Sequence, residues 1–374
     1  MSIYLDYNAS TPVAPEVADA MQPYLRQGFG NPSSRHWASA GLQETLAAAR
    51  EQVAALLGSA ADEIVFTSGG SEATNHALKG AYFASGRRDA HLITTQIEHP
   101  ATIETCRFLE RLGANVTYLP VDGSGMVTPV DVRAAITADT ILVSVMHANN
   151  ETGTIQPIAE ISAIAHEDGA LMHTDVAQSA GKIPVDVRAL GVDLLTLAGH
   201  KLYAPKGVGA LFSRRGVGIE PLIHGGGQEA GQRSGTESIV MAVALGTACA
   251  LARERLDPAA LGHIRDYFWE KLQQRFGDGI VLNGHPDHRL PNTLNVSFVG
   301  RVGSKLLEAL DGIAASTGSA CHEDSVTMSP VLAAMGLSDR VAMGAIRFSV
   351  GYDTTTAEID AVVDAVTEAA PVSA

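Results

Sequence analysis

Short apolar segments rich in β-branched residues alternate along this chain with longer segments of helical periodicity. Seven such segments lie at 64–67, 91–95, 116–120, 141–146, 171–174, 194–197 and 208–212. Strands joined by helical crossovers pair in parallel, and the helices then cover both faces of the sheet. The alternation therefore predicts an α/β domain whose mainly parallel sheet has seven strands.

Helical segments are expected at 72–84, about 101–112, 157–166 and about 237–255. The pattern changes after Asp257-Pro258, where the chain is expected to continue as helix, strand, strand and helix. That order indicates a second, smaller α+β domain. We expect residues 15–256 to form the large domain, and residues 1–14 together with 257–374 to form the small one.

The charge of the chain excludes some classes of partner. Its 374 residues include 26 Lys plus Arg and 41 Asp plus Glu, which gives a formal net charge of −15. Because nucleic acids and anionic membranes attract clustered cations, direct binding to either is disfavoured. The sequence contains no apolar segment of about 18 residues and no signal-peptide pattern at its start, so we expect a cytoplasmic protein.

Cysteine and lysine are scarce, which narrows the candidates for special chemistry. The three cysteines, Cys106, Cys249 and Cys321, are widely spaced and form no C-x-x-C pair. We therefore expect no disulfide framework, no structural zinc and no other metal site. Cys106 and Cys249 fall in expected helices and are interpreted as structural. Only six lysines are present.

Polar residues follow the carboxyl ends of five predicted strands, which is the edge where parallel sheets bind ligands. They are Gly70 and Ser71 in a glycine-rich turn, His99, Asn150, Asp175 with Gln178, and Lys201. A phosphate-binding turn, a histidine, amides, a carboxylate and an amine are thus expected to meet at one edge of the sheet.

This combination suits pyridoxal phosphate. Lys201 supplies an amine that can bind the cofactor covalently, Asp175 an anion beside the ring nitrogen, and His99 a neighbour for the ring. Gly70 and Ser71 supply a phosphate site at the start of a helix. Each residue alone has an ordinary interpretation, as a tight turn, a cap or a solvated side chain. Their joint placement favours the cofactor.

Ordered motifs run through nearly the whole chain. They are Tyr4-Leu-Asp-Tyr-Asn-Ala-Ser-Thr-Pro, Gly30-Asn-Pro-Ser-Ser, Phe66-Thr-Ser-Gly-Gly-Ser-Glu-Ala-Thr-Asn, Glu98-His-Pro-Ala, Asn149-Asn-Glu-Thr-Gly, Asp175-Val-Ala-Gln, Gly199-His-Lys-Leu-Tyr-Ala-Pro-Lys-Gly, Arg233-Ser-Gly-Thr, Gly318-Ser-Ala-Cys and Ile346-Arg-Phe-Ser. With them the chain resembles the cysteine desulfurases of the NifS/IscS type, which have the class V aminotransferase fold. The resemblance implies a pyridoxal-phosphate-dependent transferase of fold type I.

The resemblance also implies roles for single residues. Lys201 is expected to carry the cofactor and to move the α-proton of the substrate, and His99 to stack on the ring and assist acid–base steps. Asp175 is expected to pair with the ring nitrogen, and Gln178 to bond the phenolic oxygen. Arg347 is expected to bind the substrate carboxylate, which its planar fork suits.

Further contacts are implied around the same cofactor. Asn150 is expected beside the phenolic oxygen and the substrate carboxylate. Thr236 is expected to reach the phosphate of a neighbouring subunit, which implies a homodimer. The residues expected around the phosphate within one chain are Gly70, Ser71, Gly199 and His200.

The sequence departs from the family pattern at the phosphate site. The family usually carries a serine where this chain has Ala198, and the loss of one hydrogen-bond donor costs about 1–3 kcal/mol if nothing replaces it. The turn reads Gly69-Gly70-Ser71 where the family has Gly-Ala-Thr, so the hydroxyl is kept. Lys206 is a rival amine, but its Pro-Lys-Gly context indicates a turn, which favours Lys201.

Cys321 lies in a segment of small residues without periodicity, from 314 to 325, which predicts a loop. A thiol that attacks a substrate sulfur and then presents it to an acceptor needs an exposed carrier of this kind. His322 either lowers the pKa of this thiol or faces solvent, whereas Glu323 and Asp324 tend to raise it.

The expected reaction converts L-cysteine to L-alanine and transfers its sulfur to Cys321 as a persulfide, for delivery to a sulfur-acceptor protein. Iron–sulfur cluster assembly, tRNA thiolation and sulfur modification of DNA all remain open as the destination. The alternatives are a selenocysteine lyase, whose cysteine segment is similar, a plain aminotransferase, and a non-catalytic platform that docks sulfur-relay partners.

Overall fold

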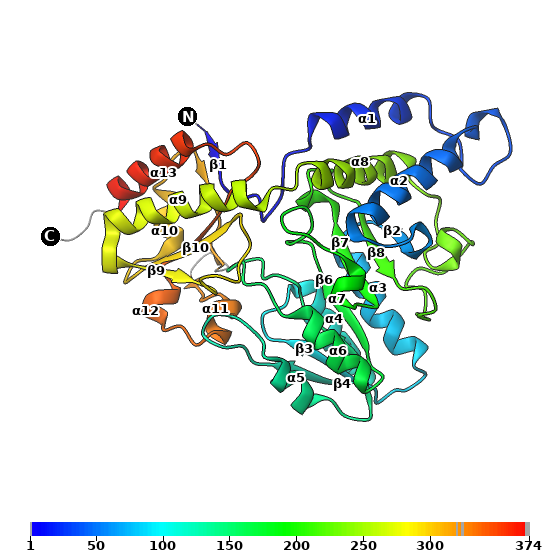
Figure 1. Ribbon diagram of the computed structural model, residues 1–374, viewed down its shortest axis with the longest axis horizontal. Helices are drawn as coiled ribbons and strands as arrows, with labels where there is room; N and C mark the ends of the chain where they lie inside the picture. Colours follow the sequence, from blue (N-terminus) through cyan, green and yellow to red (C-terminus); the bar gives the residue numbers. More distant parts are fainter. Residues whose placement is uncertain (1, 319–320, 323–324, 371–374) are drawn as a thin grey trace.

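The computed structural model describes residues 2–318, 321–322 and 325–370, without the side chains of residues 321, 322, 325 and 326. It consists of two units that lie side by side (Figure 1). The larger unit is built on a seven-stranded sheet with the order β2-β8-β7-β6-β5-β3-β4. Its strands are β2 (Ile64–Thr67), β3 (His91–Thr95), β4 (Asn115–Leu119), β5 (Thr140–Ser144), β6 (Leu171–Asp175), β7 (Leu194–Ala198) and β8 (Gly209–Ser213).

The strands of this sheet are mainly parallel, as predicted. The pairs β4–β3, β3–β5, β5–β6 and β6–β7 are parallel, and only β8 runs antiparallel to its neighbours β7 and β2. The predicted bounds of β2 and β3 agree with the observed ones, and those of the other five strands differ by one or two residues at one or both ends. Such shifts are expected because apolar periodicity marks the middle of a strand better than its ends.

Helices cover both faces of the sheet. Consecutive strand residues point to opposite faces, so Leu92 packs in the cluster with α3 and α4, and Ile93 packs in the cluster with α2, α6 and α8. The helices of this unit are α1 (Pro15–Arg26), α2 (Leu42–Leu57), α3 (Gly70–Ala84), α4 (Pro100–Leu112), α5 (Pro129–Ala135), α6 (Ile158–Glu167), α7 (Val187–Leu190) and α8 (Ile239–Glu254). Four of these helices, α1, α2, α5 and α7, were not predicted from the sequence.

The smaller unit has its own antiparallel sheet of order β14-β10-β9, packed against long helices. Phe268, Phe276, Phe298 and Phe348 form aromatic pairs in its core. Its strands are β1 (Ile3–Tyr4), β9 (Ile280–Asn283), β10 (Thr293–Phe298), β11 (Ile313–Ala314) and β14 (Ala345–Ser349), and its helices are α9 (Pro258–Phe276), α10 (Gly303–Glu308), α11 (Pro330–Ala334), α12 (Asp339–Ala342) and α13 (Thr356–Ala369). The expected order of helix, strand, strand and helix was therefore incomplete.

The N-terminal segment belongs to the smaller unit by its packing. β1 pairs in parallel with β11, and Ile3 and Leu5 are buried in the same cluster as the aromatic pairs. The chain then crosses to α1 in the larger unit (Figure 1). The division at residues 14 and 256 stays a prediction, which this packing supports.

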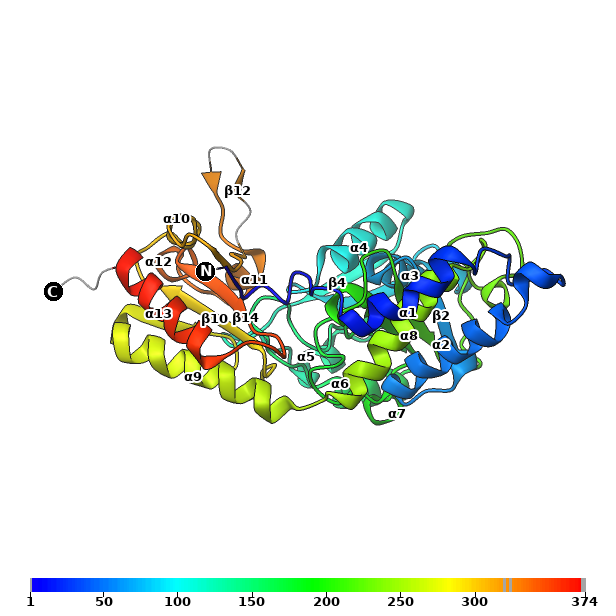
Figure 2. The ribbon, with the colours of Figure 1, turned by 90° about the horizontal axis from the view of Figure 1, so that it is seen from above.

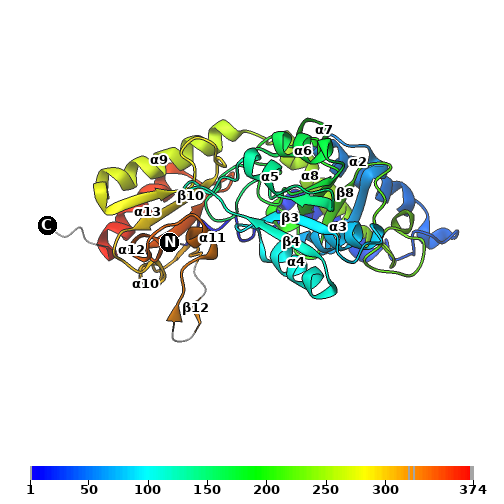
Figure 3. The ribbon, with the colours of Figure 1, turned by 90° about the horizontal axis from the view of Figure 1, so that it is seen from below.

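The segment that carries Cys321 is a short antiparallel ribbon. β12 (Cys321–His322) pairs with β13 (Ser325–Val326), in the register Cys321 with Val326. The ribbon projects from the smaller unit, as Figures 2 and 3 show from above and below. The prediction of a loop was wrong for the backbone of β12 because a two-residue strand is too short to show apolar alternation. The prediction that the Cys321 side chain is exposed lies outside the described residues.

None of the helices described is long and apolar enough to cross a membrane. No group of three or more His, Cys, Asp and Glu side chains within the described ranges is arranged to hold a metal ion.

Candidate active site

A cavity of about 580 Å³ opens at the carboxyl ends of β6 and β7, beside the first turns of α3 and α4. The strands β7, β6, β5 and β3 are neighbours in the sheet, so the residues that follow them meet at one edge. Nine residues expected at the site line this cavity. They are Gly70, Ser71, His99, Asn150, Asp175, Gln178, His200, Lys201 and Arg347.

Lys201 ends a short 3₁₀ turn, Gly199–Lys201, that follows β7 directly. Its Nζ donates hydrogen bonds to the main-chain oxygens of Asn8 and Ala9, the latter at 2.8 Å. Burial lowers the pKa of Lys201 from its usual value near 10.5 to about 8, and the neighbouring charge of Arg347 adds to this effect. The amine is therefore partly neutral near physiological pH, as a nucleophile or a base must be.

Asp175 and His99 both line the cavity near Lys201. Asp175 is the last residue of β6, and its Oδ1 accepts a hydrogen bond of 2.8 Å from the N–H of Ala177. Burial raises the pKa of Asp175 above its usual value. The hydrogen bond from Ala177 and the neighbouring His99 and Lys201 oppose this rise only in part. A cationic group at this buried carboxylate would be strongly favoured.

His99 caps α4 through its ring. Its Nδ1 accepts a hydrogen bond of 3.1 Å from the N–H of Ala101. An Nδ1 that accepts carries no proton, so the neutral ring has its proton on Nε2. Desolvation in the cavity lowers the pKa of His99, although the neighbouring Asp175 carboxylate opposes part of this effect.

The start of α3 forms a cradle for an anion. Gly69 caps this 15-residue helix with a φ of +149°, and a Cβ at this position would meet no described atom within 4 Å. The first-turn N–H groups of a helix lack partners within the helix and attract anions. The Nδ1 of His200 is buried and has no hydrogen-bond partner among the described residues.

The charge state of His200 suits the same cradle. Burial lowers the pKa of His200 to about 4, so its ring is neutral at physiological pH, and a neutral ring still has one N–H to donate. A Cβ built on Gly70 would lie 3.2 Å from the Cβ of Ala198. Where the family has a serine, this chain thus places a methyl group against the glycine turn.

Arg347 is fixed by the protein itself. Its Nη2 pairs with Asp6 at 2.7 Å, and its Nη1 donates to the main-chain oxygen of Asn150 at 2.9 Å. Its Nε is buried without a partner in the described part of the chain. Nη1 and Nη2 each have a second N–H besides the bonds to Asn150 and Asp6, so Arg347 can still donate to a carboxylate without losing either partner.

Two residues expected at the site are not among those that line the main cavity. Gly199 is buried against Val208 and donates its N–H to the Val208 oxygen at 3.0 Å. Thr236 is exposed and lines a separate cavity of about 250 Å³, which shares Ser68 and Gly207 with the main one.

Cys106 and Cys249 are buried in α4 and α8, as predicted for structural residues. Burial raises the pKa of the Cys106 thiol to about 12 and raises that of Cys249 as well. A buried thiol that keeps its proton is a poor nucleophile.

Asp6 and Asn8 also contribute to the site, although neither was predicted as a site residue. Asn8 is almost fully buried, and its main-chain oxygen accepts hydrogen bonds from both Lys201 and Gln178. Its side chain donates to Thr293 Oγ1 at 2.8 Å. One sequence feature could have indicated these residues. Asp6 and Asn8 are polar and follow the apolar Ile3 and Leu5, within a motif that the chain shares with the family.

The chain is similar to known proteins over nearly its whole length. Residues 3–362 match the family model of the class-V aminotransferases. The chain is 47% identical over 366 residues to the cysteine desulfurase IscS of Dictyoglomus turgidum, which covers 97% of this chain and 93% of the relative.

Two solved structures have the same fold. A NifS-like protein superposes with a TM-score of 0.92 at 38% identity, covering 98% of this chain and 99% of its own. SspA in complex with cysteine superposes with a TM-score of 0.84 at 39% identity, covering 93% of this chain and 99% of its own.

The chain belongs to the class-V aminotransferase family, whose members are pyridoxal-phosphate-dependent enzymes. Within that family it belongs to the cysteine desulfurases of the NifS/IscS type. The resemblance drawn from the sequence motifs and the predicted fold class are both confirmed.

Proposed function

We propose that this chain uses pyridoxal phosphate to convert L-cysteine to L-alanine and holds the released sulfur as a persulfide on Cys321. The observation that carries the proposal is the meeting of the half-buried Lys201 amine, the Asp175 carboxylate and the anion cradle of α3 in one cavity. The family membership of the chain and the cysteine complex of SspA support the same substrate.

The residues present fit the cofactor. The cradle at Gly69 and the unpartnered Nδ1 of His200 would hold its phosphate, Asp175 would face its ring nitrogen, and Lys201 would bind it covalently. When bound, the cofactor supplies an electron-withdrawing ring that stabilises negative charge on the substrate carbon. The volume of about 580 Å³ falls in the range of small-molecule sites.

The protein's own groups would orient the substrate and move its protons. Arg347, held by Asp6 and the Asn150 oxygen, would bind the carboxylate of L-cysteine through N–H groups that these two bonds leave over. Lys201, once free, would take the α-proton on Nζ because its lowered pKa leaves a neutral amine available. His99, with its proton on Nε2, would assist the proton transfers at the cavity wall.

In the sulfur step Cys321 would act on a substrate whose carbon is activated by the cofactor's electron-withdrawing ring. The Cys321 thiolate would attack the substrate sulfur, a sulfur–sulfur bond would form, and the carbon–sulfur bond would break. Its electron pair would stay on the carbon, which protonation turns into the methyl group of alanine. The atoms balance without an external oxidant, since one thiol and L-cysteine give one persulfide and L-alanine.

Two partners belong to the proposal. A second copy of the chain would bring its Thr236 to the phosphate, which accounts for the exposed position of Thr236 beside Ser68 and Gly207. A sulfur-acceptor protein would take the persulfide from the projecting ribbon of β12 and β13 (Figure 2).

The test is a single turnover assay on the purified protein. With L-cysteine, alanine and protein-bound persulfide are expected in equal amounts before any acceptor is added. Formation of an α-keto acid in place of alanine would identify an aminotransferase instead. Strong preference for L-selenocysteine in a competition assay would identify a selenocysteine lyase, and a colourless protein that binds no cofactor would identify a docking platform.

The pKa of Lys201 gives a prediction for the cofactor-free protein. Because burial lowers this pKa to about 8, the amine loses its proton at lower pH than an ordinary lysine, and its reactivity rises through pH 8. The rate of acetylation by acetic anhydride, followed by mass spectrometry of the Lys201 peptide, is expected to have its midpoint near pH 8. The exposed Lys305 serves as the internal reference, and a midpoint above about pH 10 would contradict the prediction.

A further inference from the structure

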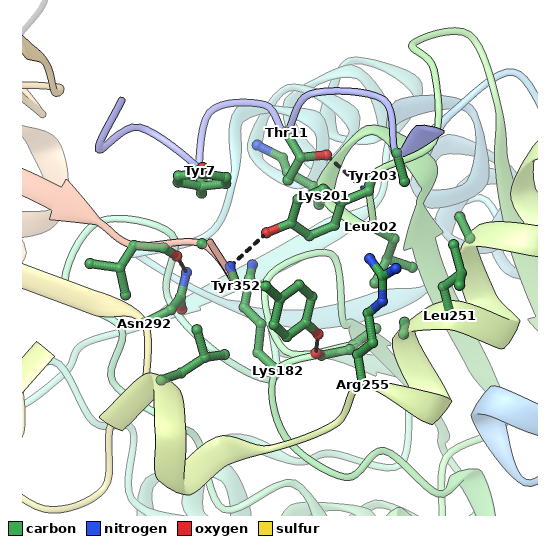
Figure 4. Close-up of a pocket in the computed structure, with 18 residues that line it drawn as sticks. Tyr7, Thr11, Lys182, Lys201, Leu202, Tyr203, Leu251, Arg255, Asn292 and Tyr352 are labelled. Carbon is green, nitrogen blue, oxygen red and sulfur yellow. Dashed lines mark hydrogen bonds between the residues drawn. The ribbon is translucent and has the colours of Figure 1, made fainter. Parts of the chain in front are cut away.

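Lys182 is a buried amine that the proposed reaction does not use. It is 7% exposed and lies in the turn after β6, directly behind the active site. Figure 4 shows it beside Lys201, Tyr352 and Asn292 around a small internal cavity. That cavity has room for about one water, at about 20 Å³.

The small cavity gives Lys182 no counter-ion. The charged residues among its described lining are Lys182, Lys201 and Arg255, and all three are cations. Burial lowers the pKa of Lys182 to about 7, and the neighbouring Lys201 and Arg347 contribute in the same direction. Burying an amine costs free energy unless its N–H groups find hydrogen-bond acceptors, so the contacts of Lys182 matter.

The two hydrogen bonds that the structure describes for the Lys182 side chain both go to one residue. Its Nζ donates to the main-chain oxygen of Gln178 at 2.9 Å and to the side-chain Oε1 of Gln178 at 3.2 Å. A neutral amine has two N–H donors, which match these two acceptors. Lys182 therefore binds both the backbone and the amide of Gln178 in either charge state.

One N–H group of the Gln178 side-chain amide has no hydrogen-bond partner among the described residues. Oε1 accepts from Lys182, and Nε2 donates to the main-chain oxygen of Asn8 at 3.0 Å. An amide nitrogen has two N–H groups, so one remains. Gln178 lines the main cavity, where the cofactor's phenolic oxygen is expected, and that oxygen needs a donor.

Without Lys182 the buried Oε1 would lose its donor. Gln178 is only 5% exposed, so water does not readily replace the lost bond, and an unsatisfied buried acceptor is costly. The amide would then rotate towards other donors in the site and withdraw its free N–H. The hydrogen bond from Nε2 to the Asn8 oxygen would then be the one described side-chain contact that still orients the amide.

We propose that Lys182 is a positioning residue: by holding both oxygens of Gln178, it fixes this amide so that an N–H, and not the C=O, faces the cofactor's phenolic oxygen. The proposal rests on the proposed function, because it assumes that pyridoxal phosphate occupies the main cavity. It differs from a purely structural role for Lys182, in which stability would change but the cofactor would not be affected.

The test compares Lys182→Met, Gln178→Leu and the double variant by absorbance titration of the protein-bound cofactor. Removal of a donor to the phenolic oxygen destabilises its deprotonated form, so each single variant is expected to raise the titration midpoint by about 0.5 to 1 pH unit. In the Lys182→Met background, Gln178→Leu is expected to add almost nothing, since the two residues act through one contact.

Two further variants sharpen the comparison. Lys182→Gln keeps a donor and is expected to shift the midpoint less than Lys182→Met. Lys305→Met removes an exposed lysine of α10 and is expected to leave the midpoint unchanged. Additive shifts in the double variant, or a wild-type midpoint in folded Lys182→Met, would overturn the proposal.

A measurement on the wild-type protein covers the case in which Lys182→Met does not fold. The side-chain amide protons of Gln178 are expected to exchange slowly with solvent in a ¹⁵N-labelled sample, because both ends of the amide are held. Fast exchange would overturn the proposal. If instead the wild-type protein binds no cofactor or forms no alanine, the proposed function fails, which is a distinguishable result.

Discussion

Replacing Lys201 by alanine is expected to lower the rate of alanine formation from L-cysteine by about 10³-fold or more. Lys201 would both bind the cofactor and move the α-proton, so one substitution removes two roles. Its Nζ is held by the Asn8 and Ala9 oxygens, and its pKa is lowered to about 8 by burial. Loss of the covalent protein–cofactor link is measured by borohydride reduction followed by mass spectrometry.

The matched control for this variant is Lys206→Ala. Lys206 lines the same cavity but is exposed, and its removal is expected to leave the borohydride-reducible link in place. Retention of that link in Lys201→Ala, or its loss in Lys206→Ala, would assign the amine to Lys206 instead.

Replacing Cys321 by serine is expected to abolish persulfide formation while cofactor binding and its yellow absorbance persist. Cys106 and Cys249 are buried in helices, and burial raises the pKa of both thiols, so neither is suited to attack a substrate sulfur. The backbone of Cys321 lies in the ribbon that projects from the smaller unit (Figure 3).

The control for Cys321→Ser is the double variant Cys106→Ala and Cys249→Ala. It is expected to form persulfide in the same amount as the wild-type protein, because Cys321 remains. The measurement is thiol-selective labelling with an alkylating reagent, read by mass spectrometry after one turnover. Persulfide on the Cys321→Ser protein would show that another thiol accepts the sulfur.

The larger unit was predicted well because its signal is local. Each of the seven strands is a short apolar run, and residues after several of them, such as Asp175 and Lys201, lie at the edge expected for a parallel sheet. The smaller unit was predicted less completely. Elements such as α11, α12 and the two-residue β12 are too short for a periodic pattern to mark them.

Within the site, sequence reasoning failed where contacts cross the chain over long distances. Asn8 meets Lys201, Gln178 and Thr293, and Asp6 meets Arg347, through bonds that join the N-terminus to both units. Apolar periodicity and short motifs describe neighbouring residues, so they do not predict contacts between residues far apart in the chain.

The sequence by itself determined the α/β class, the family and most of the residues that line the cavity, because apolar periodicity and motifs are properties of neighbouring residues. Only the tertiary structure decided which of these residues share one cavity and how their charges are set. It placed Gly199 in the packing and Thr236 outside the main cavity. It also placed Lys182 behind Gln178. Burial and hydrogen-bond partners depend on the whole fold, and a pKa follows from them.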